Sequence, residues 1–318
     1  MRNRRSSFLT GWHRQRGAAL LLLMLAVIIS MTTVLVVALS TDRLQTLRQV
    51  DSRATLAEAR DALIDYAILQ PHIATGEPFA LPCPDIDSSG GYLEGEAHTA
   101  VCGADGQTVI GRLPWRTLGL PALKDAGSEC LWYVVSGSWK QAGASTAAMV
   151  NPDSNGQLQL ASVDTGAILE GVDPADRPVA MVIAPMRPLS GQTRPAMTPS
   201  SQCSQGFTAS NFMEADAGSG TSNYQLAGVA DVLDVLGVAA NPSEAHNDRI
   251  VTITRNDIAE RIYGRPAFDR EIRDLGLAVA ACLANYAAQN PGGASDLRLP
   301  WPAPVALVDY RQNAPVSY

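Results

Sequence analysis

The chain has 318 residues and a mass of 33.7 kDa, a length that suits one or two domains. Apolar residues make up 46% and charged residues 17%, which excludes a disordered chain, because disorder requires low hydrophobicity and high charge. The net charge of −7 argues against nucleic acid as a partner, because nucleic-acid binding relies on clustered Lys and Arg.

The charge is distributed unevenly along the chain. Residues 1–41 contain five arginines and no acidic residue, so this segment carries +5 of the total of −7 and the remainder carries −12. Residues 17–41 are 25 consecutive uncharged residues, most of them apolar. As a helix they would be about 37 Å long at ~1.5 Å per residue, enough to cross the ~30 Å hydrocarbon core of a bilayer. The arginines before this run predict a cytoplasmic N-terminus, with the rest of the chain across the membrane.

A cleaved secretory signal peptide is the alternative explanation of this segment. Its apolar core would be only ~7–15 residues long and would end in a small-x-small cleavage site. The observed run is longer and ends in ValAlaLeuSerThr at 37–41, which has no clear site of this kind. We therefore expect residues 18–41 to remain as a membrane anchor.

The helical pattern continues beyond the apolar run. Residues 42–70 are amphipathic, with apolar residues at three- and four-residue spacing among charged ones, and no Gly or Pro interrupts residues 18–70 before Pro71. We predict one helix about 80 Å long at ~1.5 Å per residue. Its second half should pack against a globular domain.

A short basic leader ends in ArgGlnArgGly at residues 14–17 and is followed by AlaAlaLeuLeuLeuLeuMetLeu and the amphipathic extension. This arrangement resembles the N-terminus of type IV prepilins and pseudopilins. In that family a prepilin peptidase cleaves after the glycine and methylates the new N-terminus, which implies cleavage between Gly17 and Ala18. Most members carry Glu at the fifth mature position, where this chain has Leu22. The absence of that Glu resembles minor subunits at filament tips, including the large tip pseudopilin of type II secretion.

The resemblance implies a structural subunit of a type IV pilus or a type II secretion filament. It places the chain in the inner membrane as a single-pass protein, with a periplasmic domain that is extracellular once assembled. The implied partners are other pilins or pseudopilins through the N-terminal helix, the prepilin peptidase and the inner membrane. No nucleic-acid partner is indicated.

After Pro71 the sequence changes to short apolar runs between turn residues. Four of these runs predict strands, at 131–135, 157–163, 179–184 and 250–254. Residues 188–223 contain several Pro and Gly residues and predict a long loop, while helical periodicity returns at 229–236 and 268–289.

These elements predict an α+β fold in which the long N-terminal helix packs on an antiparallel sheet, as in pilins. Extra loops and a C-terminal helix elaborate the domain. The expected organisation is a basic leader at 1–17, a helix at 18–70 and a periplasmic or extracellular domain at 71–318.

One sequence pattern occurs twice. AlaLeuIleAspTyrAla at 62–67 precedes LeuProCysProAsp at 81–85, and CysLeuAlaAsnTyrAla at 282–287 precedes LeuProTrpProAla at 299–303. ArgLeuProTrp also occurs twice, at residues 112–115 and 298–301. The pattern indicates either a duplicated helix-and-LeuPro unit near 268–304 or the general similarity of short Ala-rich helices that end before Pro.

All five cysteines lie beyond the predicted anchor, where oxidation is permitted. We expect Cys83 to pair with Cys102, because the two flank an irregular loop, and Cys130 to pair with Cys203. Cys282 lies on a helical stripe with other apolar residues and is expected to be a buried free thiol.

The loop after Cys83 contains a candidate calcium site. Asp85, Asp87, Ser89 and Glu96 occupy positions 1, 3, 5 and 12 of the pattern D-x-D-x-S-G-x5-E. Calcium requires several such oxygen ligands. ProCysPro at 82–84 precludes the entering helix of an EF-hand, so the alternative is a solvated turn held by the disulfide.

Enzyme motifs with HisGluXXHis, a Gly-rich phosphate loop or GlyXSerXGly are absent from the sequence, and we expect no catalytic residue. The alternative function is a signal-anchored periplasmic hydrolase or a carbohydrate- or peptide-binding protein. It predicts a deep apolar pocket with convergent polar groups. The filament subunit instead predicts that residues 42–70 are half-buried against a sheet.

Overall fold

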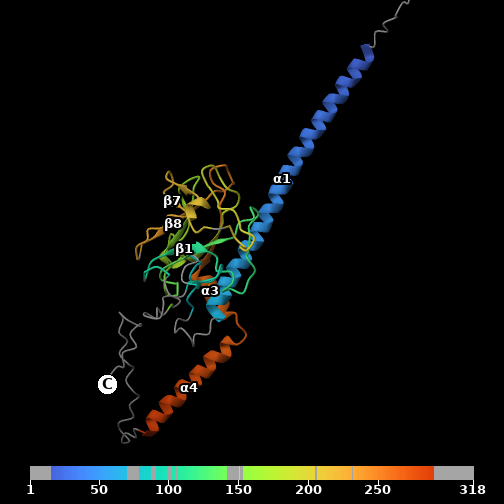
Figure 1. Cartoon of the computed structure of the whole chain (residues 1–318). Coiled ribbons are helices and arrows are strands. Elements are labelled where there is room, and N and C mark those ends of the chain that lie inside the picture. The colour runs from blue at the N-terminus through green and yellow to red at the C-terminus, as the bar shows by residue number, and fades with distance from the viewer. Residues whose placement is uncertain are drawn as a thin grey trace, which may run out of the picture. The chain divides into compact units, whose positions relative to one another are not determined.

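The computed structural model describes residues 16–69, 79–86, 91–98, 102–104, 106–141, 150, 153–204, 206–230 and 232–289. Within the first helix, α1 (Arg16–Leu69), side chains are described at 20–34 and 52–69. The chain divides into residues 1–50 and 51–318, and this boundary falls inside α1 (Figure 1). The predicted leader lies outside the described residues except for its last two positions.

In the first part of the chain, α1 runs from Arg16 to the boundary without a proline. The side chains at 20–34 are exposed at every position. No helix in the described part of the chain has both the length and the apolar character that a membrane span needs.

In the second part, residues 52–69 of α1 bury one face. Leu56, Ala59, Leu63 and Ala67 are buried at three- and four-residue intervals, and they belong to the main hydrophobic core. Charged residues such as Glu58 lie on the opposite, exposed face. Because an α-helix repeats every 3.6 residues, the amphipathic pattern of the sequence places the apolar residues on one packed face of α1 and the charged residues on the solvated face.

The main sheet has four antiparallel strands in the order β1-β2-β5-β9. These strands are β1 (Val109–Arg112), β2 (Trp132–Val135), β5 (Pro178–Ala184) and β9 (Arg249–Thr254). Alternation along β5 sends Ala180 and Val182 into the core with α1, while Met181 and Ile183 enter a second core on the other face.

A smaller sheet covers that other face, with the order β4-β3-β8. Its strands are β3 (Leu158–Ser162), β4 (Ile168–Glu170) and β8 (Asp234–Val238), and β3 pairs with β8 in parallel. Leu158 and Leu236 pack with Phe212 against the β2 and β5 side chains. The main sheet therefore lies between α1 and the smaller sheet and is buried on both faces.

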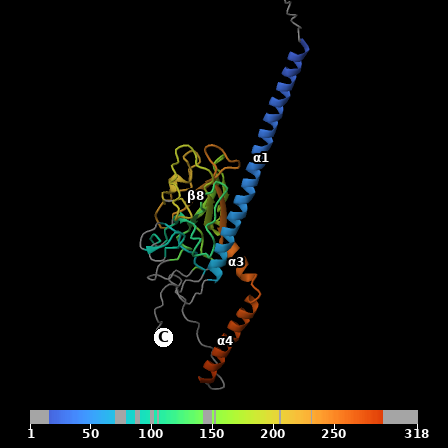
Figure 2. The same cartoon turned by 45° about the vertical axis from the view of Figure 1, so that its right-hand side comes forward.

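The remaining elements are short, apart from one helix. A two-stranded pair, β6 (Ala215–Asp216) and β7 (Thr221–Ser222), and two 3-10 turns, η2 (Pro174–Asp176) and η3 (Ala209–Asn211), lie in the connections. Two helices follow β9, namely α3 (Arg255–Tyr263) and α4 (Phe268–Gln289). A capping box formed by Thr254 and Asp257 begins α3. Figure 2 shows α4 as an extended helix after α3.

The α+β fold class is confirmed, and so are the four predicted strands and the helix at 268–289. The helix predicted at 229–236 is wrong, because residues 234–238 form β8 and pair with β3. The apolar spacing around Leu236 imitates a helix, but pairing with a strand 76 positions earlier overrides local preference. Cys282 is a free thiol, but it is exposed and not buried as expected, because no residue of α4 is buried.

Candidate functional site

An extended apolar surface lies on the helix at residues 20–34. Its large hydrophobic side chains are 54% to 74% exposed. The hydroxyl groups of Thr32 and Thr33 donate to the carbonyl oxygens of Ile28 and Ile29, each at 2.9 Å, so these polar groups are satisfied within the helix. A helix with an apolar surface of this kind is normally covered by lipid or by other helices.

The two predicted cleavage residues are the second and third positions of α1, and their side chains lie outside the described residues. Leu22, at the fifth position after Gly17, is 67% exposed. It adds to the exposed apolar surface of the helix and carries no charge.

Polar contacts fix residues 52–69 of α1 to the domain. The Ser52 hydroxyl accepts a hydrogen bond from the Ala126 amide at 3.0 Å. The Arg60 guanidinium lies 2.6 Å from the Asp257 carboxylate, which also caps α3. Because Arg60 also donates to the Thr252 carbonyl at 3.2 Å, one side chain joins α1, β9 and α3.

Two of the LeuPro segments lie together beneath α1. Leu81 and Leu113 are buried in the same core as the α1 residues. The backbones of Asp85 and Arg112 form an antiparallel bridge, with hydrogen bonds of 3.0 and 2.8 Å. The segments LeuProCysProAsp and ArgLeuProTrp, far apart in sequence, are therefore neighbours in the fold.

Asp85 does not face solvent as a surface calcium ligand would. Its side chain is buried, and its Oδ2 accepts a hydrogen bond from the Gly95 amide at 2.7 Å. Burial raises the pKa of Asp85 from 3.8 to about 6, although the Gly95 hydrogen bond opposes the shift. Gly95 has a φ of +81°, and a Cβ there would lie 2.3 Å from the Trp115 ring, so this position requires glycine.

The other predicted calcium ligands are not brought together in the described part of the chain. Glu96 accepts a hydrogen bond from the Leu93 amide at 2.8 Å, while Asp87 and Ser89 lie outside the described residues. Among the residues that the structure describes, no group of three His, Cys, Asp or Glu side chains is placed to hold a metal ion. Calcium binding therefore stays a prediction.

The structure contains both cysteine pairs. Cys83 and Cys102 have Cα atoms 5.8 Å apart, and Cys130 and Cys203 have Cα atoms 5.5 Å apart. The buried Lys140 ammonium donates to the carbonyl oxygens of Cys102 and Ala104, which fixes the chain beside the first disulfide.

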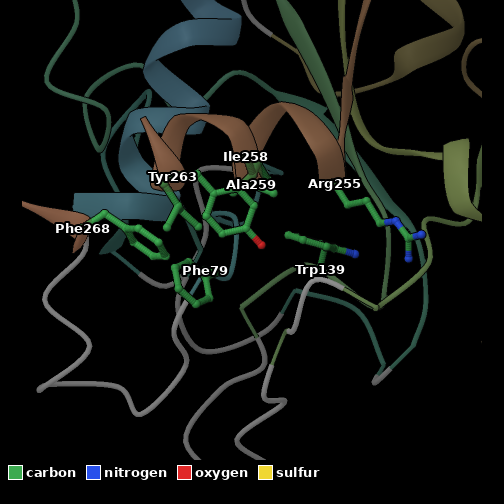
Figure 3. Close-up of a pocket in the computed structure, with 8 residues that line it drawn as sticks. Phe79, Trp139, Arg255, Ile258, Ala259, Tyr263 and Phe268 are labelled. Atoms are coloured by element: carbon green, nitrogen blue, oxygen red, sulfur yellow. The ribbon is translucent and has the colours of Figure 1, made fainter. Parts of the chain in front are cut away.

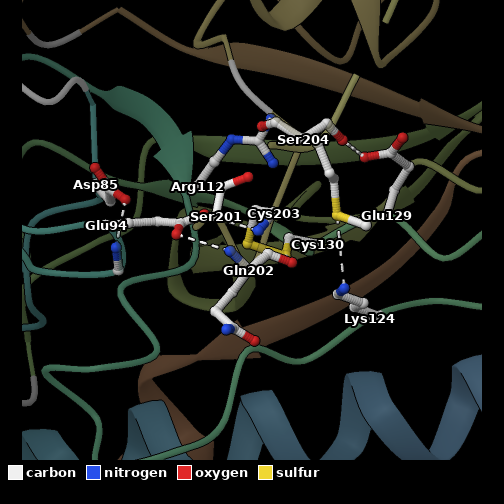
Figure 4. The surroundings of a disulfide bond; sticks show 12 residues. Asp85, Glu94, Arg112, Lys124, Glu129, Cys130, Ser201, Gln202, Cys203 and Ser204 are labelled. Carbon is white, nitrogen blue, oxygen red and sulfur yellow. Dashed lines mark hydrogen bonds between the residues drawn. A yellow bond between two sulfur atoms is a disulfide. The ribbon is translucent and has the colours of Figure 1, made fainter. Parts of the chain in front are cut away.

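Charged side chains surround the second disulfide and hold the long loop that contains Cys203 (Figure 4). The Glu94 carboxylate accepts hydrogen bonds from the amides of Gln202 and Cys203 at 2.9 and 2.7 Å. The Arg112 guanidinium donates to the Ser204 carbonyl at 2.7 Å and lies 5.1 Å from the Trp132 ring centre. Burial lowers the pKa of Arg112, while the Glu129 carboxylate opposes this effect.

A second arginine, Arg194, binds the loop to the sheet from inside. Its guanidinium donates to the carbonyl oxygens of Pro185, Met186 and Phe212, and it lies 3.9 Å from the Glu129 carboxylate. Its side chain is 4% exposed. The sequence does not indicate these contacts of Arg194, because the residue lies in a predicted loop. Arg112 has a sequence signal, since it belongs to the repeated ArgLeuProTrp.

A small apolar pocket lies beside α3 (Figure 3). Its volume is about 180 Å³, and its lining residues are Phe79, Trp139, Arg255, Ile258, Ala259, Ile262, Tyr263 and Phe268. Trp139 donates its indole N–H to the Ser154 carbonyl at 3.1 Å, so it offers no free donor to a ligand. This pocket lacks the set of convergent polar groups that the alternative function predicts.

Trp115, Trp132 and Trp139 do not line one surface that could bind a sugar or a peptide. Trp132 and Trp139 are buried in different cores, and Trp115 packs over Gly95. Trp301 lies outside the described residues. Comparison with protein-family models, curated proteins and solved structures gives no match to this chain.

Proposed function

We propose that the chain is a minor, pilin-like or pseudopilin-like subunit of a type IV pilus or a type II secretion filament. One observation carries the proposal: a single helix begins with an apolar surface at 20–34 and then buries one face, at 52–68, against a four-stranded antiparallel sheet. The basic leader and the Gly17–Ala18 step support it from the sequence.

In this proposal the N-terminal helix first serves as an anchor. The leader arginines keep the N-terminus in the cytoplasm, and residues 18–41 occupy the inner membrane while the acidic domain lies in the periplasm. The peptidase cleaves after Gly17 and methylates Ala18. The apolar surface then exchanges lipid for the equivalent helices of other subunits, which buries the same area in the filament.

Leu22 supports a position at the tip of the filament or another minor position. A subunit in the body of a filament has a neighbour on both sides along its axis, and the carboxylate of the usual Glu pairs with one neighbour's N-terminus. Without that carboxylate the chain lacks one of the two contacts. Priming or capping the filament requires only one of them.

A hydrolase or binding protein is less well supported. Ligand pockets usually have volumes of roughly 300–1,000 Å³ and a few convergent polar groups. The described pocket has a volume of about 180 Å³ and an almost entirely apolar lining. We therefore propose a non-catalytic, structural role.

The test is the mass of the N-terminus of the full chain, expressed with and without an active prepilin peptidase. We expect a new, methylated N-terminus at Ala18, and a Gly17→Val variant that stays uncleaved. Gly11→Val is the matched control, because it changes a leader glycine outside the cleavage step. An intact Met1 in the membrane form with active peptidase would contradict the proposal.

Calcium is a separate part of the proposal and rests on the spacing of Asp85, Asp87, Ser89 and Glu96. We expect calcium to raise the thermal unfolding midpoint relative to chelator, because a ligand that binds only the folded state stabilises it. Asp87→Ala should remove this difference. An equal calcium effect in that variant would show that the ion binds elsewhere.

A further inference from the structure

The apolar residues of α4 recur at a seven-residue period and are accessible to solvent. They follow one another at alternating intervals of four and three, and in chain order they are Phe268, Ile272, Leu275, Val279, Cys282 and Tyr286. The helix has 22 residues, which is three heptads and one residue. The structure describes the whole of α4 and none of its residues is buried; Leu275 is 62% and Val279 is 52% exposed.

This row of residues has the width of a coiled-coil seam, not that of a helix face that packs on a sheet. The face that α1 buries is widened by adjacent residues, such as Leu63 with Ile64. In α4 the large apolar residues off the seven-residue period are only Leu277 and Leu283. A single row at positions a and d of a heptad abcdefg is the pattern of helices that pair with one another.

The residue types in the row favour two parallel helices. Position d holds Phe268, Leu275 and Cys282, and position a holds Ile272, Val279 and Tyr286. In parallel coiled coils, β-branched residues such as Ile272 and Val279 at a, with Leu275 at d, favour the two-stranded form. A two-fold axis along such a pair places each residue beside its own copy, so a second copy of the chain supplies the matching seam.

The charges beside the row are compatible with this pairing. In a parallel pair the g position of one helix faces the e position of the next heptad in its partner. Glu271 at g then faces Gly276, and Ala278 at g faces Leu283, so no like charges oppose each other across the seam. The charged residues at f, b and c, on the outer side of the helix, are Arg270, Arg273 and Asp274.

We propose that α4 is a dimerisation helix whose partner is α4 of a second copy of this chain, parallel and in register. The a and d side chains interdigitate, which removes from water the apolar surface that one copy exposes. Three heptads are at the lower end of the length that specifies a coiled coil, so we expect the pairing to weaken on dilution. The inference does not depend on the proposed filament role, because the apolar surface at 20–34 takes no part in it.

The test compares two leucines of the same helical turn, one in the seam and one outside it. Leu275 at d and Leu277 at f have nearly equal exposures of 62% and 63%. In the full chain carrying Cys282→Ser, Leu275→Cys is expected to form a disulfide-linked dimer with an added mild oxidant, read by non-reducing electrophoresis and peptide mapping. Leu277→Cys is the matched control and should stay uncross-linked. Equal cross-linking of the two, as association through residues 20–34 would give, would overturn the proposal.

The unmodified chain tests the direction of the pairing. Cys282 is free, while the other four cysteines are paired in disulfides, so it is the thiol that can join two copies. An antiparallel pair brings only one level of the helix beside its own copy, whereas a parallel pair does so at every level. We therefore expect dimers both through Cys282 and, in the variant, through position 275. Cross-linking at only one of these two positions would contradict a parallel pair.

A further measurement keeps Cys282 as the reporter and changes the seam by charge. Val279→Asp at a should lower the yield of the Cys282 dimer by at least about tenfold, since an unpaired carboxylate is costly to bury in an apolar seam. Ala281→Asp at c is the matched control and should leave the yield unchanged. Equal yields would overturn the proposal. So would the absence of a Cys282 dimer, whether maleimide labels the thiol rapidly, which means an uncovered helix, or slowly, which means a different cover such as lipid.

Discussion

Asp85 shows how one residue can be important for reasons unrelated to the pattern that drew attention to it. The calcium spacing marks it as a ligand, but the structure uses its carboxylate to hold the Gly95 amide beneath Trp115. One carboxylate oxygen, Oδ1, is buried without a hydrogen-bond partner among the described residues. That arrangement favours the protonated acid and explains the direction of its pKa shift.

This shift predicts a dependence of stability on pH. Because the pKa of Asp85 in the folded chain is about 6 instead of 3.8, the folded state holds an extra proton between these values. The free energy of unfolding therefore falls as pH rises through this window, by about 3 kcal/mol in total, and stays low above it. We expect urea unfolding of Asp85→Asn to lose this fall between pH 4 and pH 6.5. Asp176→Asn, at an exposed position, should keep it.

Arg194 is the second residue whose geometry makes a clear prediction. Lys in its place keeps the charge, but one ammonium group cannot reach the three carbonyl oxygens that the planar guanidinium binds. We expect Arg194→Lys to reduce the free energy of unfolding by about 2–4 kcal/mol, because buried carbonyl groups lose their donors. Arg187 forms an exposed pair with Glu244, so Arg187→Lys should cost less than about 1 kcal/mol. Equal losses would contradict this role.

At the scale of elements, the helix–sheet contact of α1 dominates the domain. Leu63 is fully buried between the helix and the main sheet, whereas Leu69 at the end of the same helix is 73% exposed. We expect Leu63→Ala to lower the free energy of unfolding by about 2–5 kcal/mol through lost burial and a residual cavity. Leu69→Ala should change it by less than about 0.5 kcal/mol. A similar small effect of both, in chemical denaturation, would show that α1 is not docked in this way.

Elements with a local signature could be predicted, and elements defined by distant pairing could not. The run ValAlaMetValIleAla at 179–184 is apolar throughout, as a strand buried on both faces must be, and it forms most of β5. By contrast, β8 depends on a parallel partner far away in the sequence, and β1 includes a glycine within only four residues. The helix α3 is short, and its capping box at Thr254 and Asp257 was the signal that could have revealed it.

The same distinction holds within the site. The Cys83–Cys102 pair follows from the irregular loop that these two cysteines flank, so spacing was informative there. The joining of Asp85 to Arg112 depends on pairing between two separate segments, and the joining of Arg194 to three carbonyl groups depends on the path of the long loop. Nothing local in the sequence encodes that path.

At the scale of the whole molecule, the Cys130–Cys203 disulfide determines how the long loop is attached. It closes a separation of 73 residues, between the start of β2 and the loop. We expect the Cys130→Ser/Cys203→Ser double variant to lose about 2–4 kcal/mol of unfolding free energy, since the unfolded chain gains freedom. Cys282→Ser is the matched control and should leave stability unchanged. An unchanged double variant would mean that the buried arginines alone hold the loop.

The burial of β5 on both faces also determines how slowly its backbone amides exchange hydrogen with solvent. Every residue from Val179 to Ala184 is inaccessible to solvent, since α1 covers one side and the smaller sheet covers the other. Backbone amides in such a strand exchange hydrogen with solvent only when the whole domain opens. The exchange rate of the slowest amides in β5 therefore reports how often the whole domain unfolds, while amides in loops and helix ends exchange through smaller openings. Amide exchange measured in this one strand therefore gives the stability of the folded domain as a whole.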